Sequence, residues 1–256
     1  LLSQRNFNTN ISSLSGAAVL AALSDNNYHV VNMGTGLLDG FTIKDGYASG
    51  TFTNAVGGGL YCNVPSNTAA IVRNCIFVNN YASTSGGAMA QMGRFGTTGR
   101  IIENCTFSSN SSGISAGALF FDQGTIGGTY ANSYVTNCVF AGNTSVSGGA
   151  ISYEYGLVNQ YCVFSNNSFY NNTGSTTAGT FRIQGWGASS IPPVFSNNIV
   201  WGNSSFFSGV VGSSLNATYN DIQVAFAGTG NINLDPLFVN PLPTPGGDYR
   251  LQSCSP

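Results

Sequence analysis

Charged side chains are scarce in this chain of 256 residues, because Asp, Glu, Lys and Arg make up only 6% of it, against about 25% in an ordinary soluble domain. Seven cations cannot form the basic stripe with which a protein binds nucleic acid through its phosphates. The chain has one histidine and no apolar run near the roughly 20 residues of a membrane span. The sequence therefore predicts neither a nucleic-acid-binding protein nor a transmembrane segment.

Glycine and asparagine are abundant instead. The chain holds 34 Gly and 30 Asn, and its hydrophobic share is still 42%. That share argues against disorder, which needs low hydrophobicity and usually a high net charge, whereas the net charge here is −2. The chain opens at Leu1 without a cationic and apolar leader and stops at Pro256. We therefore expect a fragment of a longer protein, with any export signal outside this segment.

Two short patterns recur with a period of about 30 residues. The first reads Asn-Cys-x-Phe in its clearest copies, and its fourth residues are Ile43, Phe77, Phe107, Phe140, Phe169 and Val200. The second consists of Gly, a small residue and an apolar residue, and its first glycines are Gly58, Gly87, Gly117, Gly149, Gly179 and Gly209. Two independent markers that keep one period indicate a repeat architecture.

Both patterns are typical of strands. Apolar residues alternate with small or polar ones in each copy, which is the period of a strand and not of a helix. The third residues of the second pattern are predicted to form one inward column: Leu60, Met89, Leu119, Ile151, Phe181 and Val211. The segments between the copies are rich in Ser, Asn, Gly and Thr, which favour turns. Short strands and tight turns with one period predict a solenoid, in which stacked coils bury a common apolar side.

The predicted fold is all-β: a right-handed parallel β-helix (solenoid) of six to seven coils, each with three strands and about 30 residues. We expect residues 1–27 to form an N-terminal entry or cap segment, residues 28–214 the coils, and residues 215–256 a C-terminal closing segment of the same domain. The scarcity of charge fits such a stack, because like charges in one column would lie about 4.8 Å apart and repel.

Two structural columns follow from the repeat. The asparagines at its seventh position are predicted to stack as a ladder of hydrogen-bonded amides: Asn80, Asn110, Asn143, Asn172 and Asn203. The cysteines at its second position are predicted to form an inward column: Cys75, Cys105 and Cys138. Side chains in register on parallel strands point the same way, which suits a disulfide poorly, so we expect free, buried thiols. No Cys-x-x-Cys pair is present, and no metal or cofactor is predicted.

The paired markers resemble the repeats of chlamydial polymorphic outer-membrane proteins, with Gly-Gly-Ala-Ile at 148–151 and Phe-x-x-Asn at 77–80, 107–110, 140–143 and 169–172. They also resemble the right-handed parallel β-helix modules of large bacterial surface proteins that are common in the Bacteroidota. The resemblance implies export to the bacterial cell surface, by an autotransporter or a type IX route, with the anchoring domain outside this segment. The same fold carries lyases, hydrolases, adhesins and stalks, so fold alone does not decide function.

We expect a non-catalytic module of a secreted or cell-surface protein, an adhesin or structural stalk that works as a stiff rod. Its expected partners are the remainder of a larger surface protein and either surface glycans or another cell-surface protein. Loops such as 111–116 and 173–178 would be displayed away from the anchor. The nine carboxylates are scattered over different coil positions, so no catalytic residue is assigned. Arg73 and Glu103 share one position in adjacent coils, which predicts a surface ion pair between them.

Two alternatives remain open. A polysaccharide lyase or hydrolase needs three or more carboxylates, or an acid with an arginine, on one outer face, and such a cluster would count against the scaffold. A glycan-binding module would hold sugar rings on exposed aromatic faces. The candidate rings are Tyr170 and Trp201, which share the outward fifth position of neighbouring coils, and Trp186, which is predicted to lie in a loop. Otherwise the C-terminal segment, with Phe206 and Phe207, covers the first two rings.

Overall fold

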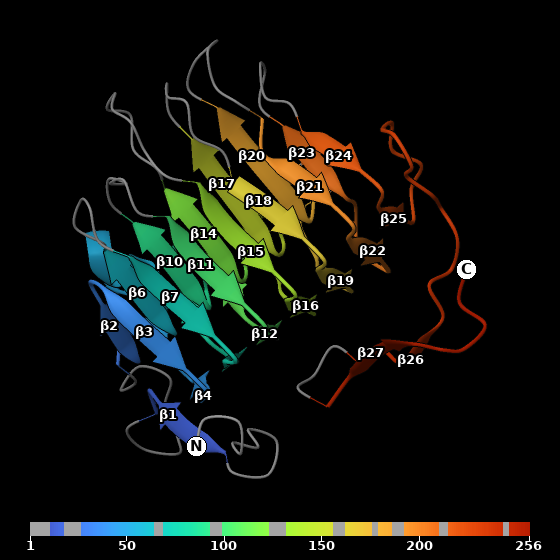
Figure 1. Cartoon of the computed structure of the whole chain (residues 1–256). Helices are drawn as coiled ribbons and strands as arrows, with labels where there is room; N and C mark the ends of the chain where they lie inside the picture. Colours follow the sequence, from blue (N-terminus) through green and yellow to red (C-terminus); the bar gives the residue numbers. More distant parts are fainter. Residues whose placement is uncertain are drawn as a thin grey trace.

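The computed structural model describes residues 11–17, 27–63, 69–92, 99–122, 132–155, 162–175, 179–185, 192–209, 215–242 and 246–256. These residues form short strands that wind into a stack of coils (Figure 1). Three parallel sheets, here named A, B and C, run along the stack, and each takes its neighbouring strands from successive coils. In every coil the chain passes from sheet B to sheet C and then to sheet A.

The strands are short, with two to five residues each. Sheet A comprises β1 (Ser12–Ser15), β4 (Phe41–Lys44), β8 (Ile76–Val78), β12 (Thr106–Ser108), β16 (Val139–Ala141), β19 (Ser168–Tyr170), β22 (Ile199–Trp201) and β25 (Asp221–Ile222). Sheet B comprises β2 (Val31–Met33), β6 (Leu60–Asn63), β10 (Met89–Met92), β14 (Leu119–Asp122), β17 (Ile151–Tyr155), β20 (Phe181–Gly185) and β23 (Phe207–Gly209). Sheet C comprises β3 (Gly36–Asp39), β7 (Ala70–Arg73), β11 (Arg100–Glu103), β15 (Ser133–Thr136), β18 (Cys162–Ser165), β21 (Val194–Ser196) and β24 (Asn216–Thr218).

The predicted fold class is confirmed as a right-handed parallel β-helix with about 30 residues per coil. A small fourth sheet, formed by β5 (Tyr47–Ala48), β9 (Tyr81–Ala82) and β13 (Ser111–Ser112), follows sheet A in the first coils. Beyond the coils, β26 (Phe238–Asn240) and β27 (Asp248–Leu251) form an antiparallel hairpin. The 3₁₀ turn at Phe52–Ala55 is a further regular element of the described chain.

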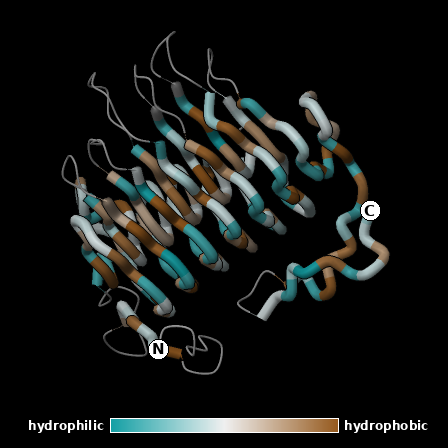
Figure 2. The backbone as a smooth tube through the Cα atoms, viewed as in Figure 1, coloured by the Kyte–Doolittle hydropathy of each residue, from teal (hydrophilic) through white to brown (hydrophobic). Residues whose placement is uncertain are grey.

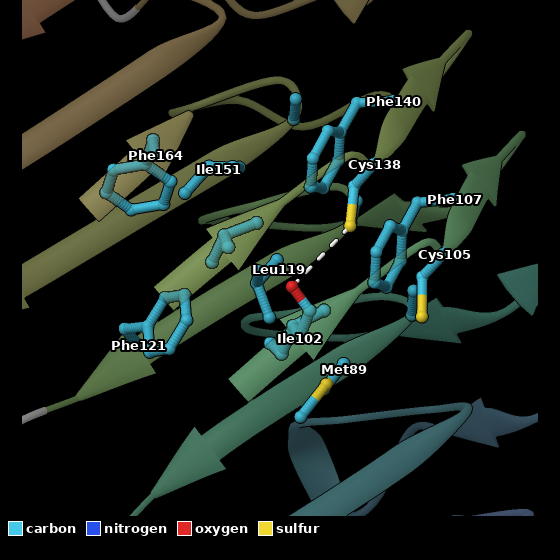
Figure 3. Packing of buried hydrophobic residues seen from close by; sticks show 14 of the residues in the cluster. Met89, Ile102, Cys105, Phe107, Leu119, Phe121, Cys138, Phe140, Ile151 and Phe164 are labelled. Carbon is cyan, nitrogen blue, oxygen red and sulfur yellow. Dashed lines mark hydrogen bonds between the residues drawn. The ribbon is translucent and has the colours of Figure 1, made fainter. Parts of the chain in front are cut away.

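The register of the sheets follows the two sequence markers. The fourth residues of the first marker pair in order across sheet A, from Ile43 to Val200. Inside the coils, Phe77, Phe107, Phe140 and Phe169 stack with ring centroids 4.8–5.0 Å apart and planes within 7° of parallel. Figure 3 shows two of these rings beside the cysteine column. Each of the four is fully buried, which stabilises the fold by roughly 1.5–3 kcal/mol per ring.

The second inward column differs from prediction at its last member. Its order across sheet B is Val31, Leu60, Met89, Leu119, Ile151, Phe181 and Phe207. Phe207 therefore occupies the position expected of Val211, which lies outside the described residues. The last coil is shorter at this corner than a constant period predicts, so Phe207 and not Val211 pairs with Phe181.

Hydrophobic and hydrophilic residues alternate along the coils, as Figure 2 shows.

Left-handed backbone makes the sharp corner before sheet A. The first residue of each marker copy, Asn in five successive coils, has a φ of 53–57° at positions 74, 104, 137, 166 and 197. Asparagine tolerates this region better than other residues with a Cβ, because its short side chain bonds locally. Asparagine has a second structural function at other positions of the repeat, where its side-chain amide points inward and forms hydrogen bonds to neighbouring coils. The high Asn content thus has two separate structural causes.

Both ends of the stack carry additional chain. Of the expected entry segment 1–27, the structure describes residues 11–17 and 27, and β1 pairs with β4 at the first edge of sheet A. At the other end the coils continue past residue 214, since β24 and β25 extend sheets C and A. Phe226 then packs edge-on against Phe206, with ring centroids 4.9 Å apart. The chain beyond it leads to the β26–β27 hairpin, which lies beside the coils (Figure 1).

Candidate functional site

The structure brings the five ladder asparagines together in one column, in which the first four are buried and Asn203 is partly exposed. Each side-chain Nδ2 from Asn80 to Asn172 donates to Oδ1 of the next asparagine at 2.9–3.0 Å. The same Oδ1 also accepts the backbone N–H of the preceding asparagine, at 2.8–3.1 Å. A second bond from Nδ2 reaches a main-chain carbonyl one coil back, as from Asn143 to Phe107 at 2.9 Å. The side-chain amides of all five asparagines thus form hydrogen bonds within the chain.

The structure contains a second amide ladder that the sequence did not predict. Asn167, Asn198, Asn220 and Asn231 form it, again with Nδ2 to Oδ1 bonds of 3.0 Å. Its first two members hold the second position of the first marker, where earlier coils have cysteine. Asn167 Oδ1 accepts the backbone N–H of Cys138 at 2.9 Å, so the ladder joins the cysteine column directly. The signal in the sequence was the change from Asn-Cys to Asn-Asn in the weaker copies.

All six cysteines are free, and all except Cys254 are buried. In the cysteine column the thiols face main-chain carbonyls, as Cys138 Sγ does toward the oxygen of Thr136 at 3.2 Å. A longer contact runs from the same Sγ to the oxygen of Ile102 at 3.8 Å (Figure 3). Burial raises the pKa of Cys62 to about 11 and also raises the pKa of Cys105 and Cys162. These thiols are packed as small apolar groups.

Charged residues gather on neighbouring strands of sheet B, together with one arginine from β11 of sheet C. In a chain with seven cations and nine carboxylates, two of each lie here: Arg100, Asp122, Glu154 and Arg182. Asp122 and Glu154 are register partners on β14 and β17, so their Cα atoms lie one coil apart, or about 4.8 Å. Arg182 Nη1 donates to Glu154 Oε1 at 2.9 Å and to Ser152 Oγ at 3.1 Å. We call these four residues the sheet-B charge cluster.

The cluster is partly withdrawn from water. The side chains of Arg182 and Glu154 are only 18% and 22% exposed. Burial raises the pKa of Glu154, the bond from Arg182 opposes that rise, and the charge of Asp122 adds to it. Arg100 is buried on the inner side, where its Nη2 donates to the oxygen of Met92 at 3.1 Å. Burial lowers the pKa of Arg100 to about 10, while the nearby carboxylate of Asp122 favours its protonated form.

Arg182 has a third acceptor, because its Nη2 donates to Gln184 Oε1. Two carboxylates one coil apart, with a raised pKa for Glu154, are the kind of pair that acid–base catalysis uses. The same four charges also balance one another. The cluster can therefore bind a polar polymer, support acid–base chemistry, or simply neutralise itself.

The predicted Arg73–Glu103 ion pair is replaced by another. The two residues are register partners on β7 and β11, but the ion pair of Arg73 is with Asp39, at 3.2 Å. Asp39 also accepts a bond from Asn74 at 2.8 Å. Asp39 lies one coil before Arg73 and Glu103 one coil after it, so the sequence position alone did not decide which carboxylate the guanidinium takes.

The two predicted aromatic residues are neighbours, and the C-terminal hairpin covers one of them. Tyr170 and Trp201 pair in register between β19 and β22, and both are partly exposed. Phe238 stands edge-on to Tyr170 at 5.9 Å, and Tyr249 lies at 6.0 Å. Phe206 and Phe207 pack instead with Phe226 at the end of the core. Trp186, the third candidate, lies outside the described residues.

The segment 111–116, expected as a displayed loop, is largely part of the stack. Ser111 and Ser112 pair with β9, while Ser115 bridges Ser85 and Ser147 in the coils on either side. Small hydroxyl residues recur at this corner because the next coil lies directly against it. Of the second expected loop, the structure describes 173–175, where Thr173 bridges Thr144.

Within the described part of the chain, no three His, Cys, Asp or Glu residues lie close enough together to hold a metal ion. The single histidine, His29, stacks on Tyr61 with ring centroids 5.0 Å apart, and its Nδ1 lies 3.0 Å from the oxygen of Gly57. No helix among the described residues is long and apolar enough to cross a membrane.

Comparison with known protein families, curated proteins and solved structures finds no match to this chain. The parallel β-helix therefore rests on the strand topology itself, and the resemblance to chlamydial and Bacteroidota surface proteins remains a prediction.

Proposed function

We propose that this chain is a non-catalytic, rod-like module of a larger secreted or cell-surface bacterial protein. The observation that carries the proposal is the uninterrupted amide ladder from Asn80 to Asn203, which ties consecutive coils together by their side chains as well as their backbones. A stack in which each coil is bonded to both neighbours resists bending and local opening. Such a rod suits a stalk or adhesin that holds a binding surface away from its anchor.

Protease treatment of intact cells that express the full-length protein tests its location. We expect an antibody against residues 27–256 to label intact cells or secreted material, and added protease to remove that label. Retention of the protein inside protease-treated cells would overturn the proposal. Force spectroscopy of the purified module adds a mechanical test, in which a rod opens coil by coil at high force.

The sheet-B charge cluster favours a second candidate, a polysaccharide-cleaving module. Glu154 and Arg182 supply an acid with an arginine on one outer face, and Asp122 adds a second carboxylate. This is the combination that counts against a pure scaffold. We rank it second because Arg182 is held by Glu154, Ser152 and Gln184, so its guanidinium is committed to this strand pair.

A panel of neutral, acidic and amino polysaccharides, assayed for new reducing ends and unsaturated products, separates the two candidates. If the module cleaves any of them, Glu154→Gln should abolish the activity, whereas Glu103→Gln on the neighbouring sheet should leave it unchanged. Cleavage that depends on Glu154 would show that the module is an enzyme and would overturn the proposed scaffold function. Lack of cleavage across the panel leaves the rod as the function.

A further inference from the structure

One corner of the first coil carries an insertion that the other coils lack. From the fourth residue of the first marker to the first glycine of the second marker there are 15 positions in this coil, between Ile43 and Gly58, and nine or ten in the later ones. The extra residues lie between β5 and β6, which is the corner where the chain leaves sheet A for sheet B. The insertion includes the 3₁₀ turn at Phe52–Ala55.

The insertion is well ordered by its own hydrogen bonds. The N–H of Gly50 donates to the oxygen of Asn54 at 2.9 Å, and the N–H of Asn54 donates to Thr51 at 3.1 Å. Its base is tied to the next coil, because the backbone N–H and Oγ1 of Thr84 both donate to the oxygen of Ala55, at 2.9 and 2.8 Å. The turn therefore holds its tip in a fixed direction.

The tip is a phenylalanine that packs little against the described part of the chain. Phe52 is 92% exposed, and it is the most exposed large hydrophobic residue in the described chain. Its φ is 53°, in the left-handed region where a bulky side chain is strained. A strained backbone that presents an exposed ring gains nothing within this chain, and such positions are typical of contact sites. We call Phe52 on its 3₁₀ turn the knob. No charged residue occurs from Gly46 to Val72, so the knob and the chain on either side of it are neutral.

The last coils hold a cavity at the same corner. It measures about 110 Å³ and is lined by Val200, Phe206, Ile222 and Val224, together with polar residues at 203, 205 and 223. Val200 and Ile222 form its buried floor, while Val224, 66% exposed, stands at its mouth. Val200 and Ile222 belong to β22 and β25 of sheet A, and the other lining residues directly follow these two strands. The cavity is too small for a sugar chain, since ligand pockets measure roughly 300–1,000 Å³.

Its volume is somewhat below the roughly 150 Å³ of an apolar cavity that takes up benzene, and it opens to solvent, so an aromatic ring can enter it in part. Phe52 cannot reach the cavity of its own chain, because the first and last coils lie at opposite ends of the stack (Figure 1). Five coil steps of about 4.8 Å separate them. Phe52 and the cavity lie at the same corner of the coils, so a second copy that continues the stack would have its Phe52 on the side of the rod where the cavity opens.

We propose that copies of this chain associate head to tail, with Phe52 of one copy inserted into the cavity at Val200 and Ile222 of the next. This contact joins two different surfaces, so it leaves a free knob at one end and a free cavity at the other. A heterologous contact of this kind builds open chains and not closed dimers. A single ring makes a weak contact, so the chains grow with protein concentration.

Sedimentation velocity and light scattering over a concentration series test the proposal. We expect the wild-type module to form a progressive series of oligomers, and Phe52→Ala to weaken self-association at least about tenfold. Val224→Arg, which places a charge at the mouth of the cavity, should do the same. Ile114→Ala and Leu234→Arg are matched controls at exposed apolar positions, 56% and 51% exposed, and both should associate like the wild type.

A mixture of the two variants, Phe52→Ala and Val224→Arg, is the decisive experiment. Phe52→Ala keeps the cavity and Val224→Arg keeps the knob, so each alone associates at least about tenfold more weakly than the wild type, whereas the mixture forms a heterodimer and stops there. A wild type that stays monomeric up to its solubility limit would overturn the proposal. So would oligomers that persist undiminished in either variant, or a closed dimer of fixed size. Circular dichroism spectra that match the wild type establish that each variant is folded.

Discussion

Asn143 binds Asn172 through both its backbone and its side chain. Oδ1 of Asn172 accepts the N–H of Asn143 at 3.0 Å and its Nδ2–H at 2.9 Å. The second Nδ2 hydrogen of Asn143 goes to the carbonyl of Phe107 at 2.9 Å. One buried amide thus satisfies groups in three coils, which explains why a chain with so little charge still keeps consecutive coils in register.

Replacing Asn143 by alanine should destabilise the fold by about 3–5 kcal/mol, because it leaves several buried groups without partners at about 1–3 kcal/mol each. The orphaned groups are the N–H and amide of Asn110 and the carbonyl of Phe107. Urea unfolding measures the change. Asn216→Ala, at an exposed strand position, is the control and should stay within about 0.5 kcal/mol of the wild type. An equal loss in both variants would contradict the ladder.

Thiol chemistry should separate the cysteines into two classes. Cys254 is exposed and the other five are buried, with the pKa of Cys62 raised to about 11 by burial. Thiolate is the reactive form, so we expect one thiol to react with a disulfide reagent in the native protein and all six in denaturant. Cys254→Ser should remove the native reaction completely. A fast reaction that survives in this variant would show that a column cysteine is accessible.

The sequence predicted the repeating parts of this molecule well, because repetition turns one strand pattern into a register. Phe107 and Phe140 stack as the shared position of Asn-Cys-x-Phe predicts. The prediction from the sequence was incomplete where one coil departs from the period or from the residue type of the others. Phe207 replaces Val211 in sheet B because the last corner is short, and the second ladder begins at Asn167 because cysteine gives way to asparagine at that position.

The sheet-B charge cluster needed the structure for a different reason. Asp122, Glu154 and Arg182 occur on three strands whose copies share no charged motif, so their spacing in the sequence does not indicate a cluster. Register places Asp122 beside Glu154. Direction of a long side chain is set by local bonds, which is why Arg182 reaches back to Glu154 and Arg73 reaches back to Asp39.

Titration of Glu154 tests the electrostatics of the cluster. Burial raises its pKa, so the folded protein binds this proton more tightly than the unfolded chain. The stability contributed by the protonated carboxyl is present below the unfolded pKa of about 4.3, and it is lost as pH rises through the folded pKa. We expect Arg182→Gln to raise the pKa of Glu154 further and Asp122→Asn to lower it, as measured by carboxyl ¹³C chemical shifts. Shifts of the opposite sign in either variant would refute this arrangement.

The hairpin contact with Tyr170 should be separable from the coils. Burial raises the pKa of Tyr249 to about 12, and Phe238 packs edge-on against both tyrosines, at 5.9 Å from Tyr170 and 5.6 Å from Tyr249. Phe238→Ala should free the hairpin, so that the pKa of Tyr249 falls toward 10, while the coils keep their unfolding midpoint. Val239→Ala, an exposed position 47% accessible on the same strand, should leave the pKa unchanged.

The sign of the pH effect follows from the same burial. Because the folded pKa lies above the unfolded one, docking of the hairpin is strongest below about pH 10 and weakens as pH rises toward 12. Tyrosine ring NMR shifts report the titration, and limited proteolysis within 237–256 reports the release. Phe238→Ala should also expose Tyr170 beside Trp201, so glycan binding that appears only in this variant would show that the hairpin masks an aromatic surface. An unchanged Tyr249 pKa in Phe238→Ala would mean that the hairpin is held by other contacts.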